Sequence, residues 1–250
     1  MKRIFKGLLC LVFAAMLFSL PHTAMASGQP GAWAGGWSTF ATLATEGIMY
    51  TKGIAADSSG NVYAVDYYSS RIREWVAGTQ TWQTIPGSLT YPWGVATDSS
   101  GNLYVVCRVS SSGTGAIFKY VPGSGWTDIT YGYAFNDAEG IAVGPNGNVY
   151  VADTGDHKVM ELQSGASTWT TIGNDTMTYN FGFVSPVGIA VDSNNNVYVS
   201  DMVANQGYVV KRANGNTDWH TFMSFGHEPV NGVAADSSGN VYVIDGKVIN

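Results

Sequence analysis

The sequence predicts an all-β fold of repeated four-stranded sheets, because two short signatures alternate along it and its composition favours turns. The first signature is Gly, then Ile or Val, then Ala, and it begins at Gly53, Gly94, Gly140, Gly188 and Gly232. The second is Trp, any residue, Thr or Asp, then Ile or Phe, and it begins at Trp37, Trp82, Trp126, Trp169 and Trp219. The 250 residues include 31 Gly, with 13% aromatic and only 12% charged residues, which is typical of turn-rich β proteins.

The unit that begins at Gly53 shows the four strands expected in each repeat. Residues 53–57 and 62–66 are strand-forming runs joined by a Gly-containing turn, which predicts a hairpin. Residues 71–76 and 81–85 predict a second hairpin, with Gly78 in its turn. The Gly openers are 41, 46, 48 and 44 residues apart, and a four-stranded repeat of about 40 to 50 residues is typical of a β-propeller blade. The sequence therefore predicts a five-bladed β-propeller.

One repeat is similar to a known family. Residues 140–159 read GIAVGPNGNVYVADTGDHKV, and this segment resembles an NHL repeat, whose pattern is Gly-Ile-Ala-Val-Asp, Gly-Asn-Val-Tyr-Val-Ala-Asp and Asn-His-Arg. Gly144 stands where the pattern has Asp, and Asp156 and Lys158 stand where it has Asn and Arg. The resemblance extends in five copies over residues 53–250 and implies the propeller fold. It leaves function open, because the family and its relatives include binding propellers, sensor domains and metal-dependent lyases or lactonases.

The first Trp signature is separated from the repeat that it completes. The unit that begins at Gly232 ends at Asn250 without a Trp segment, and Trp37 has no preceding Gly segment. Unpaired edge strands invite aggregation, so we expect residues 37–41 to close the ring as the fourth strand of the last blade. The predicted propeller domain is therefore residues 27–250.

The first 26 residues are predicted to be a secretory signal peptide. Lys2, Arg3 and Lys6 precede the apolar run 8–20, and Ala24-Met25-Ala26 fits a cleavage site. The apolar run is shorter than the roughly 20 residues of a membrane-spanning helix. We therefore expect a secreted, periplasmic or cell-surface protein without a membrane span.

Charge and cysteine content narrow the expected partners. Removing three of the 12 Lys and Arg, and none of the 18 Asp and Glu, leaves a formal charge of −9 on residues 27–250. An acidic chain of this kind is not expected to bind nucleic acid. Cys107 is the only cysteine in residues 27–250, so no internal disulfide is expected. We also expect the protein to be a monomer and to need no cofactor.

Several polar residues recur once in each repeat, which favours a structural role. Turns that begin with Asp occur at Asp57, Asp98, Asp192 and Asp236, and their five-residue length is too short for a 12-residue calcium loop. Asp66, Asp153, Asp201 and Asp245 end the second strand of four units, and Cys107 takes that place in the other. We expect these residues to cap turns, Cys107 to be inert, and His157, at the repeat's characteristic His position, to be structural.

Function is expected where the repeats differ, in the loops that lead from each fourth strand to the next first strand. These loops carry many aromatic residues, which either fill grooves between blades or form a ligand surface. We predict a secreted, non-enzymatic binding propeller that recognises a glycan or a protein. The predicted ligand-binding residues are Tyr91, Trp93, Tyr133, Glu139, Phe183, His227 and Glu228.

The alternative is a metal-dependent lyase or lactonase with its site at the mouth of the channel. His227 with Glu139 or Glu228 could hold a divalent metal there. The histidines are not clustered in the sequence, and no nucleophile elbow or P-loop is present. We therefore assign no catalytic residue and no metal ligand from the sequence.

Overall fold

The computed structural model of the chain describes residues 3–6, 48, 50–108, 114–176 and 182–245. In these residues the chain forms five β-sheets and one short 3-10 helix, η1. The strands and η1 are β1 (Arg3–Lys6), β2 (Thr51–Ala56), β3 (Val62–Asp66), β4 (Arg71–Val76), β5 (Thr81–Thr84), β6 (Pro92–Thr97), β7 (Leu103–Cys107), β8 (Thr114–Val121), β9 (Gly125–Asp128), β10 (Phe135–Asn136), β11 (Gly140–Val143), β12 (Val149–Asp153), η1 (Thr154–Asp156), β13 (Lys158–Leu162), β14 (Thr170–Gly173), β15 (Pro186–Val191), β16 (Val197–Val203), β17 (Gln206–Arg212), β18 (Trp219–Ser224), β19 (Val230–Ala235) and β20 (Val241–Asp245).

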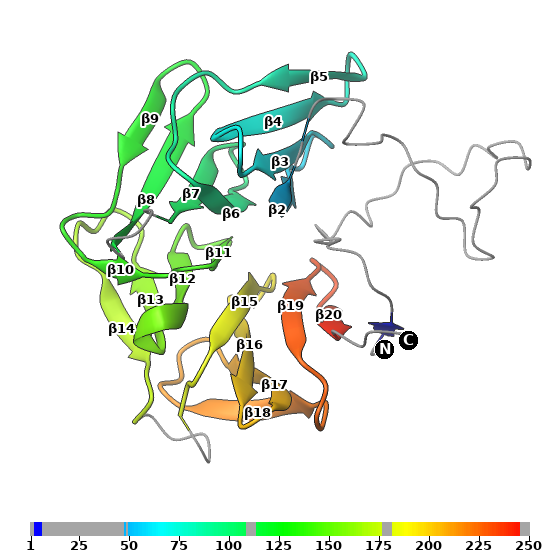
Figure 1. Cartoon of the computed structure of the whole chain (residues 1–250), viewed down its shortest axis with the longest axis vertical. Coiled ribbons are helices and arrows are strands. Elements are labelled where there is room, and N and C mark those ends of the chain that lie inside the picture. Colours follow the sequence, from blue (N-terminus) through cyan, green and yellow to red (C-terminus); the bar gives the residue numbers. More distant parts are fainter. Residues whose placement is uncertain (1–2, 7–47, 49, 109–113, 177–181, 246–250) are drawn as a thin grey trace, which may run out of the picture.

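The sheets are the blades of a β-propeller. Each of the sheets β2–β5, β11–β14 and β15–β18 is a four-stranded antiparallel meander, and β6–β9 forms another to which β10 is added at β8. The first strands β2, β6, β11, β15 and β19 pack against one another in chain order. They lie innermost, and the sheets fan outward around a common centre (Figure 1). This arrangement confirms the predicted all-β propeller.

Glycines at the start of the innermost strands let neighbouring blades approach. A Cβ atom on Gly53 would lie 2.7 Å from the carbonyl oxygen of Trp93, and one on Gly140 would collide with the carbonyl oxygen of Val187. The alanines two residues later are buried or half-buried, but the backbones of neighbouring blades meet at the glycines.

Burial of the second strands and indole hydrogen bonds tie each blade to its neighbours. Every residue of β3, β7 and β12 is buried, as expected for strands covered on both faces. Trp126 Nε1 donates to the carbonyl oxygen of Pro86 at 2.7 Å, and Trp169 Nε1 donates to that of Ile129 at 3.0 Å. Trp126 and Trp169 therefore each link their blade to the preceding one.

The repeated polar residues hold turns and loops, as predicted. Asp57 Oδ1 accepts hydrogen bonds from two backbone N–H groups of its own turn, and Asp57 Oδ2 accepts from Asn61 and from the Tyr63 hydroxyl. Asp98, Asp192 and Asp236 make the same set. These carboxylates are thus occupied by their own turns.

Two carboxylates at the ends of second strands hold the loops that enter their blades. Asp153 accepts from the backbone N–H of Asn136 at 2.7 Å, and Asp201 accepts from that of Ser185 at 2.6 Å. His157 contacts the Val184 carbonyl oxygen through Nδ1 and so links two blades. Its predicted structural role is confirmed.

The predicted closing strand, residues 37–41, lies outside the described residues, so blade number and ring closure stay predictions. Residues 3–6, which belong to the predicted signal peptide, form β1 and pair in parallel with β20. Cleavage of residues 1–26 also remains a prediction. No helix within the described part of the chain is long and apolar enough to cross a membrane.

Candidate active site

A cluster of charged and aromatic side chains lies where the innermost strands begin, at the mouth of the propeller. Lys52 is in β2, Trp93 is in β6, Arg108 follows β7, and Glu139 directly precedes β11. Backbone hydrogen bonds fix two of these positions: Arg108 N donates to the Tyr91 carbonyl oxygen at 2.9 Å, and Glu139 N donates to that of Ala152 at 3.1 Å. Three neighbouring blades therefore contribute to one site.

Arg108 bridges two carboxylates that come from the same loop. Its Nη2 lies 2.6 Å from Asp137 Oδ1, and its Nη1 lies 3.3 Å from Glu139 Oε1. The side chains of Arg108 and Glu139 are each 23% exposed, whereas that of Asp137 is 55% exposed. Glu139 is thus held in place and sheltered, yet solvent still reaches it.

Trp93 forms an aromatic wall between two cations. Lys52 Nζ lies 3.8 Å from the Trp93 ring centroid, and the guanidinium carbon of Arg108 lies 4.1 Å from it. Both distances are within the range of cation–π attraction. Tyr67 packs edge-on against Trp93 with ring centroids 5.5 Å apart, and Tyr91 lies 5.5 Å from Tyr67. The wall can contact the apolar face of a ring-shaped ligand.

The electrostatics of this cluster make Glu139 a candidate proton acceptor. Burial raises the pKa of the Glu139 carboxyl above its usual range, and nearby Asp137 raises it further, while Arg108 and Lys52 partly offset the rise. A raised carboxyl pKa brings a general base closer to neutral pH, where proton transfer is most effective. The two cations beside Glu139 can stabilise negative charge that develops on a bound carbonyl group.

Three of the predicted site residues meet in this cluster: Tyr91, Trp93 and Glu139. Tyr133 lies apart from it and is half-buried, and its hydroxyl donates to the buried Asp153 at 3.3 Å. Its ring also packs against Phe135, so Tyr133 supports the core more than it offers a surface.

The prediction that Phe183 binds a ligand is wrong. Its side chain is fully buried and packs edge-on against Trp219, with ring centroids 5.0 Å apart. The apolar ring fills the groove between two blades, because removing that area from water stabilises the fold.

His227 and Glu228 lie in the β18–β19 loop, and they do not join Glu139 in a metal-binding group. Within the described residues, no hydrogen bond or ion pair links His227 to Glu139, and no three His, Cys, Asp or Glu side chains are close enough to hold a metal ion. The donor set suggested for a metal-dependent enzyme is therefore not assembled there, and no reaction step is assigned to a metal.

Lys52, Tyr67 and Arg108 were not predicted from the sequence as site residues. Arg108 could have been found by comparing the repeats, because it is a cation at the position after the second strand, where other units have Tyr67, Thr154 and Met202. Cys107, beside it, is buried, and burial raises the pKa of its thiol to about 12. The predicted packing of Cys107 in the core is confirmed, and its inertness stays a prediction.

Comparison with known proteins supports the assignment of the repeats. The NHL repeat model matches residues 135–160 and 183–206, which contain β11–β12 and β15–β16. These two segments are NHL repeats. No curated protein sequence matches it.

Solved structures share the fold of this chain at low sequence identity. A gluconolactonase from Xanthomonas campestris is 15% identical, with 78% of this chain and 69% of that one covered and a TM-score of 0.60. A virginiamycin B lyase from Staphylococcus aureus is 13% identical, covering 78% and 63%, with a TM-score of 0.59. A chain of a nidogen–laminin complex is 18% identical, covering 78% and 72%, with a TM-score of 0.62.

These neighbours correct the prediction of a non-enzymatic binding propeller. Several are lactonases or lyases, so the enzyme alternative fits the findings better than a binding scaffold. Identities of 12–18% establish the fold alone. The chemistry must therefore be argued from this protein's own residues.

Proposed function

We propose that this NHL-repeat protein is an enzyme that hydrolyses a cyclic ester, with Glu139 as general base at the mouth of the propeller. The observation that carries the proposal is the sheltered Glu139 carboxylate, which has a raised pKa, is paired with Arg108, and lies near Lys52 and an aromatic wall. The similarity to gluconolactonases adds support for a lactone as substrate.

The reaction uses only groups of the described site and one water molecule. Glu139 takes a proton from the water, whose oxygen attacks the ester carbonyl carbon. Lys52 and Arg108 stabilise the negative charge that forms on the carbonyl oxygen. The bond between the carbonyl carbon and the ring oxygen then breaks, and Glu139 returns its proton to that oxygen, which leaves a hydroxy acid. Trp93 and Tyr67 hold the apolar face of the ring.

The test is a comparison of matched Glu→Gln variants on a panel of five- and six-membered lactones that includes gluconolactone. Glu139→Gln keeps the shape of the side chain but cannot accept the proton, so kcat should fall by about 10²- to 10⁴-fold. Glu228→Gln is the control, because it removes a carboxylate from another loop at the same mouth. Acid release, followed with a pH indicator, measures the rate.

Three outcomes would count against this proposal. They are no turnover of any lactone, equal loss in both variants, and a product with a new carbon–carbon double bond. The last outcome, detected by ultraviolet absorbance, would instead identify a lyase, in which the base takes its proton from carbon.

We also propose that the protein is exported after removal of residues 1–26 and acts as a monomer.

A further inference from the structure

A second candidate site lies at the opposite end of β11 from Glu139, where one repeat departs from the others. Four β-turns between first and second strands begin with Asp, whose Oδ2 accepts from a Tyr hydroxyl six residues later. The turn between β11 and β12 begins instead with Gly144, so Tyr150 lacks a carboxylate partner at that position. The backbone of the turn is unchanged, because Gly144 N still donates to the Asn148 carbonyl oxygen at 2.9 Å.

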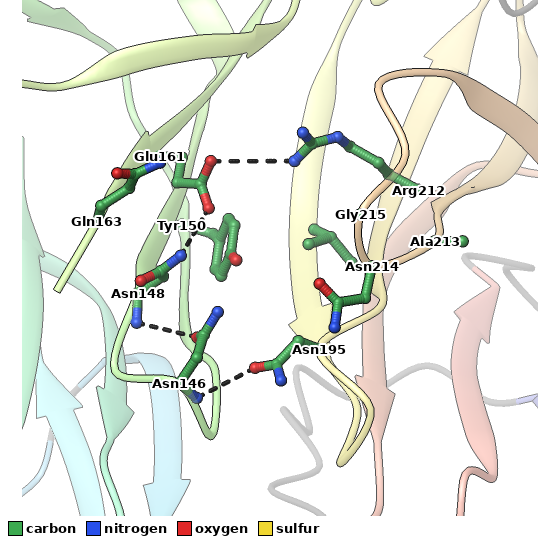
Figure 2. A pocket seen from close by; sticks show the side chains of 11 residues that line it. Asn146, Asn148, Tyr150, Glu161, Gln163, Asn195, Arg212, Ala213, Asn214 and Gly215 are labelled. Atoms are coloured by element: carbon green, nitrogen blue, oxygen red, sulfur yellow. Dashed lines mark hydrogen bonds and ion pairs between the residues drawn. The ribbon is translucent and has the colours of Figure 1, made fainter.

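A pocket of about 170 Å³ opens between this turn and the neighbouring blade. Figure 2 shows side chains from both blades facing one another across it: Asn146, Asn148, Tyr150 and Glu161 from one blade, and Asn195 and Arg212 from the next. Asn146 is exposed at the rim, so the pocket is open to solvent.

The lining contains one buried acid and one cation that are only loosely paired. Glu161 is 8% exposed, and its Oε1 accepts from Asn148 Nδ2 at 2.8 Å. Its Oε2 is 3.9 Å from Arg212 Nη1, which is too long for a good hydrogen bond. Arg212 Nε is buried and has no hydrogen-bond partner in the described part of the chain. An unpaired buried donor is costly, so the loose pairing with Glu161 leaves the Arg212 guanidinium incompletely hydrogen-bonded.

The remaining polar groups add further donors. Asn195 Oδ1 accepts from the backbone N–H of Asn146, and Asn146 Oδ1 accepts from that of Asn148, both at 3.1 Å. These bonds fix the two amide groups and leave the NH₂ donor of Asn195 without a partner among the described residues. The pocket therefore offers donors from Arg212 and Asn195, and an acceptor from Glu161, with no net charge.

We propose that this pocket binds one small, neutral, polyhydroxylated molecule of the size of a single sugar ring. Hydroxyl groups both donate and accept, which matches a lining that does both. A free anion would face Glu161, and a free cation would face Arg212, so each would meet a repulsive partner. The site is separate from the aromatic mouth, because the β11–β12 turn and Glu139 lie at opposite ends of β11.

Gly144→Asp introduces the residue that the other four turns carry, and we expect it to close the pocket. A Cβ atom on Gly144 would lie 2.7 Å from Asn146 Oδ1 and 3.0 Å from Asn195 Oδ1, so Gly144→Asp displaces both amides. The other four turns carry Asp at this position, so the fold accommodates it. The control is Gly78→Asp, which adds the same charge to a β4–β5 turn, at the same end of a blade, with nothing within 4 Å.

Isothermal titration calorimetry with glucose, galactose, mannose, N-acetylglucosamine and glycerol tests the proposal. We expect saturable binding of at least one probe, with affinity at least tenfold weaker in Gly144→Asp and in Arg212→Gln and unchanged in Gly78→Asp. Binding should also persist in Glu139→Gln, which separates this site from the proposed lactone site. Absence of saturation by every probe up to 100 mM, or undiminished binding in Gly144→Asp with an unchanged melting curve, would overturn it.

Discussion

The indole of Trp82 provides a test of ring closure. Trp126, Trp169 and Trp219 each donate from Nε1 to a carbonyl oxygen of the preceding blade, at 2.7–3.0 Å. Trp82 Nε1 is buried but has no partner in the described residues. In a closed propeller the preceding blade would be completed by residues 37–41. By the spacing in the other repeats, we expect Trp82 to donate to the carbonyl oxygen of Phe40 or Ala41.

Trp82→Phe should then have opposite consequences in closed and open chains. If the ring is closed, the substitution removes a hydrogen bond with a net value of about 0.5 to 1.5 kcal/mol. If residues 27–43 are deleted, the donor is left unsatisfied, and its removal should recover about 1 to 3 kcal/mol. The loss of apolar contact is common to both backgrounds and cancels in the comparison.

Urea unfolding followed by circular dichroism measures these differences in the free energy of unfolding. Trp126→Phe is the control, because its half-buried indole has a partner, Pro86, that the deletion does not touch. We expect the effect of Trp82→Phe to change by roughly 2 kcal/mol between the two backgrounds and that of Trp126→Phe to stay constant. An unchanged effect of Trp82→Phe would refute the closure.

Three further predictions concern stability and reactivity. Burial raises the pKa of Asp153 from 3.8 to about 7. Because the folded state then holds this proton more tightly than the unfolded state, the contribution of Asp153 to stability should fall as pH rises from about 4 to about 7. The free energy of unfolding of Asp153→Asn should lack that component of the pH dependence. Phe183→Ala should lower the free energy of unfolding in urea by about 3 to 5 kcal/mol, because it leaves a cavity in the core. Val184→Ala, at an exposed neighbouring side chain, should change it by less than about 0.5 kcal/mol. The Cys107 thiol, buried and with its pKa raised to about 12, should react with a maleimide only after the protein unfolds, and rapid labelling of the native protein would contradict its burial.

The repeat signatures determined most of the fold. Gly53 and its counterparts mark the innermost strands, the Trp segments mark the outermost, and the Asp turns join first and second strands. Each of these features depends on a few residues close together in the sequence, because a β-hairpin is a local structure. Blade identity could therefore be assigned without knowing how the blades meet.

The candidate sites depended on contacts between blades, which local patterns do not encode. Trp93 was identified from the sequence, but its cation partners are Lys52 in β2 and Arg108 directly after β7. Phe183 has the same aromatic character as Trp93, yet it turns inward against Trp219. The sequence specified which side chains were available, whereas their direction was decided by the packing of neighbouring blades.

The turn that begins at Gly144 shows what the sequence determines and what the tertiary structure decides. The sequence by itself determined that one turn lacks the repeated Asp. Only the tertiary structure decided that the missing carboxylate leaves a polar pocket, because Glu161 and Arg212 are 51 residues apart in the chain and approach one another only when adjacent blades pack. Local hydrogen bonds fixed the turn, and long-range packing of two blades produced the site.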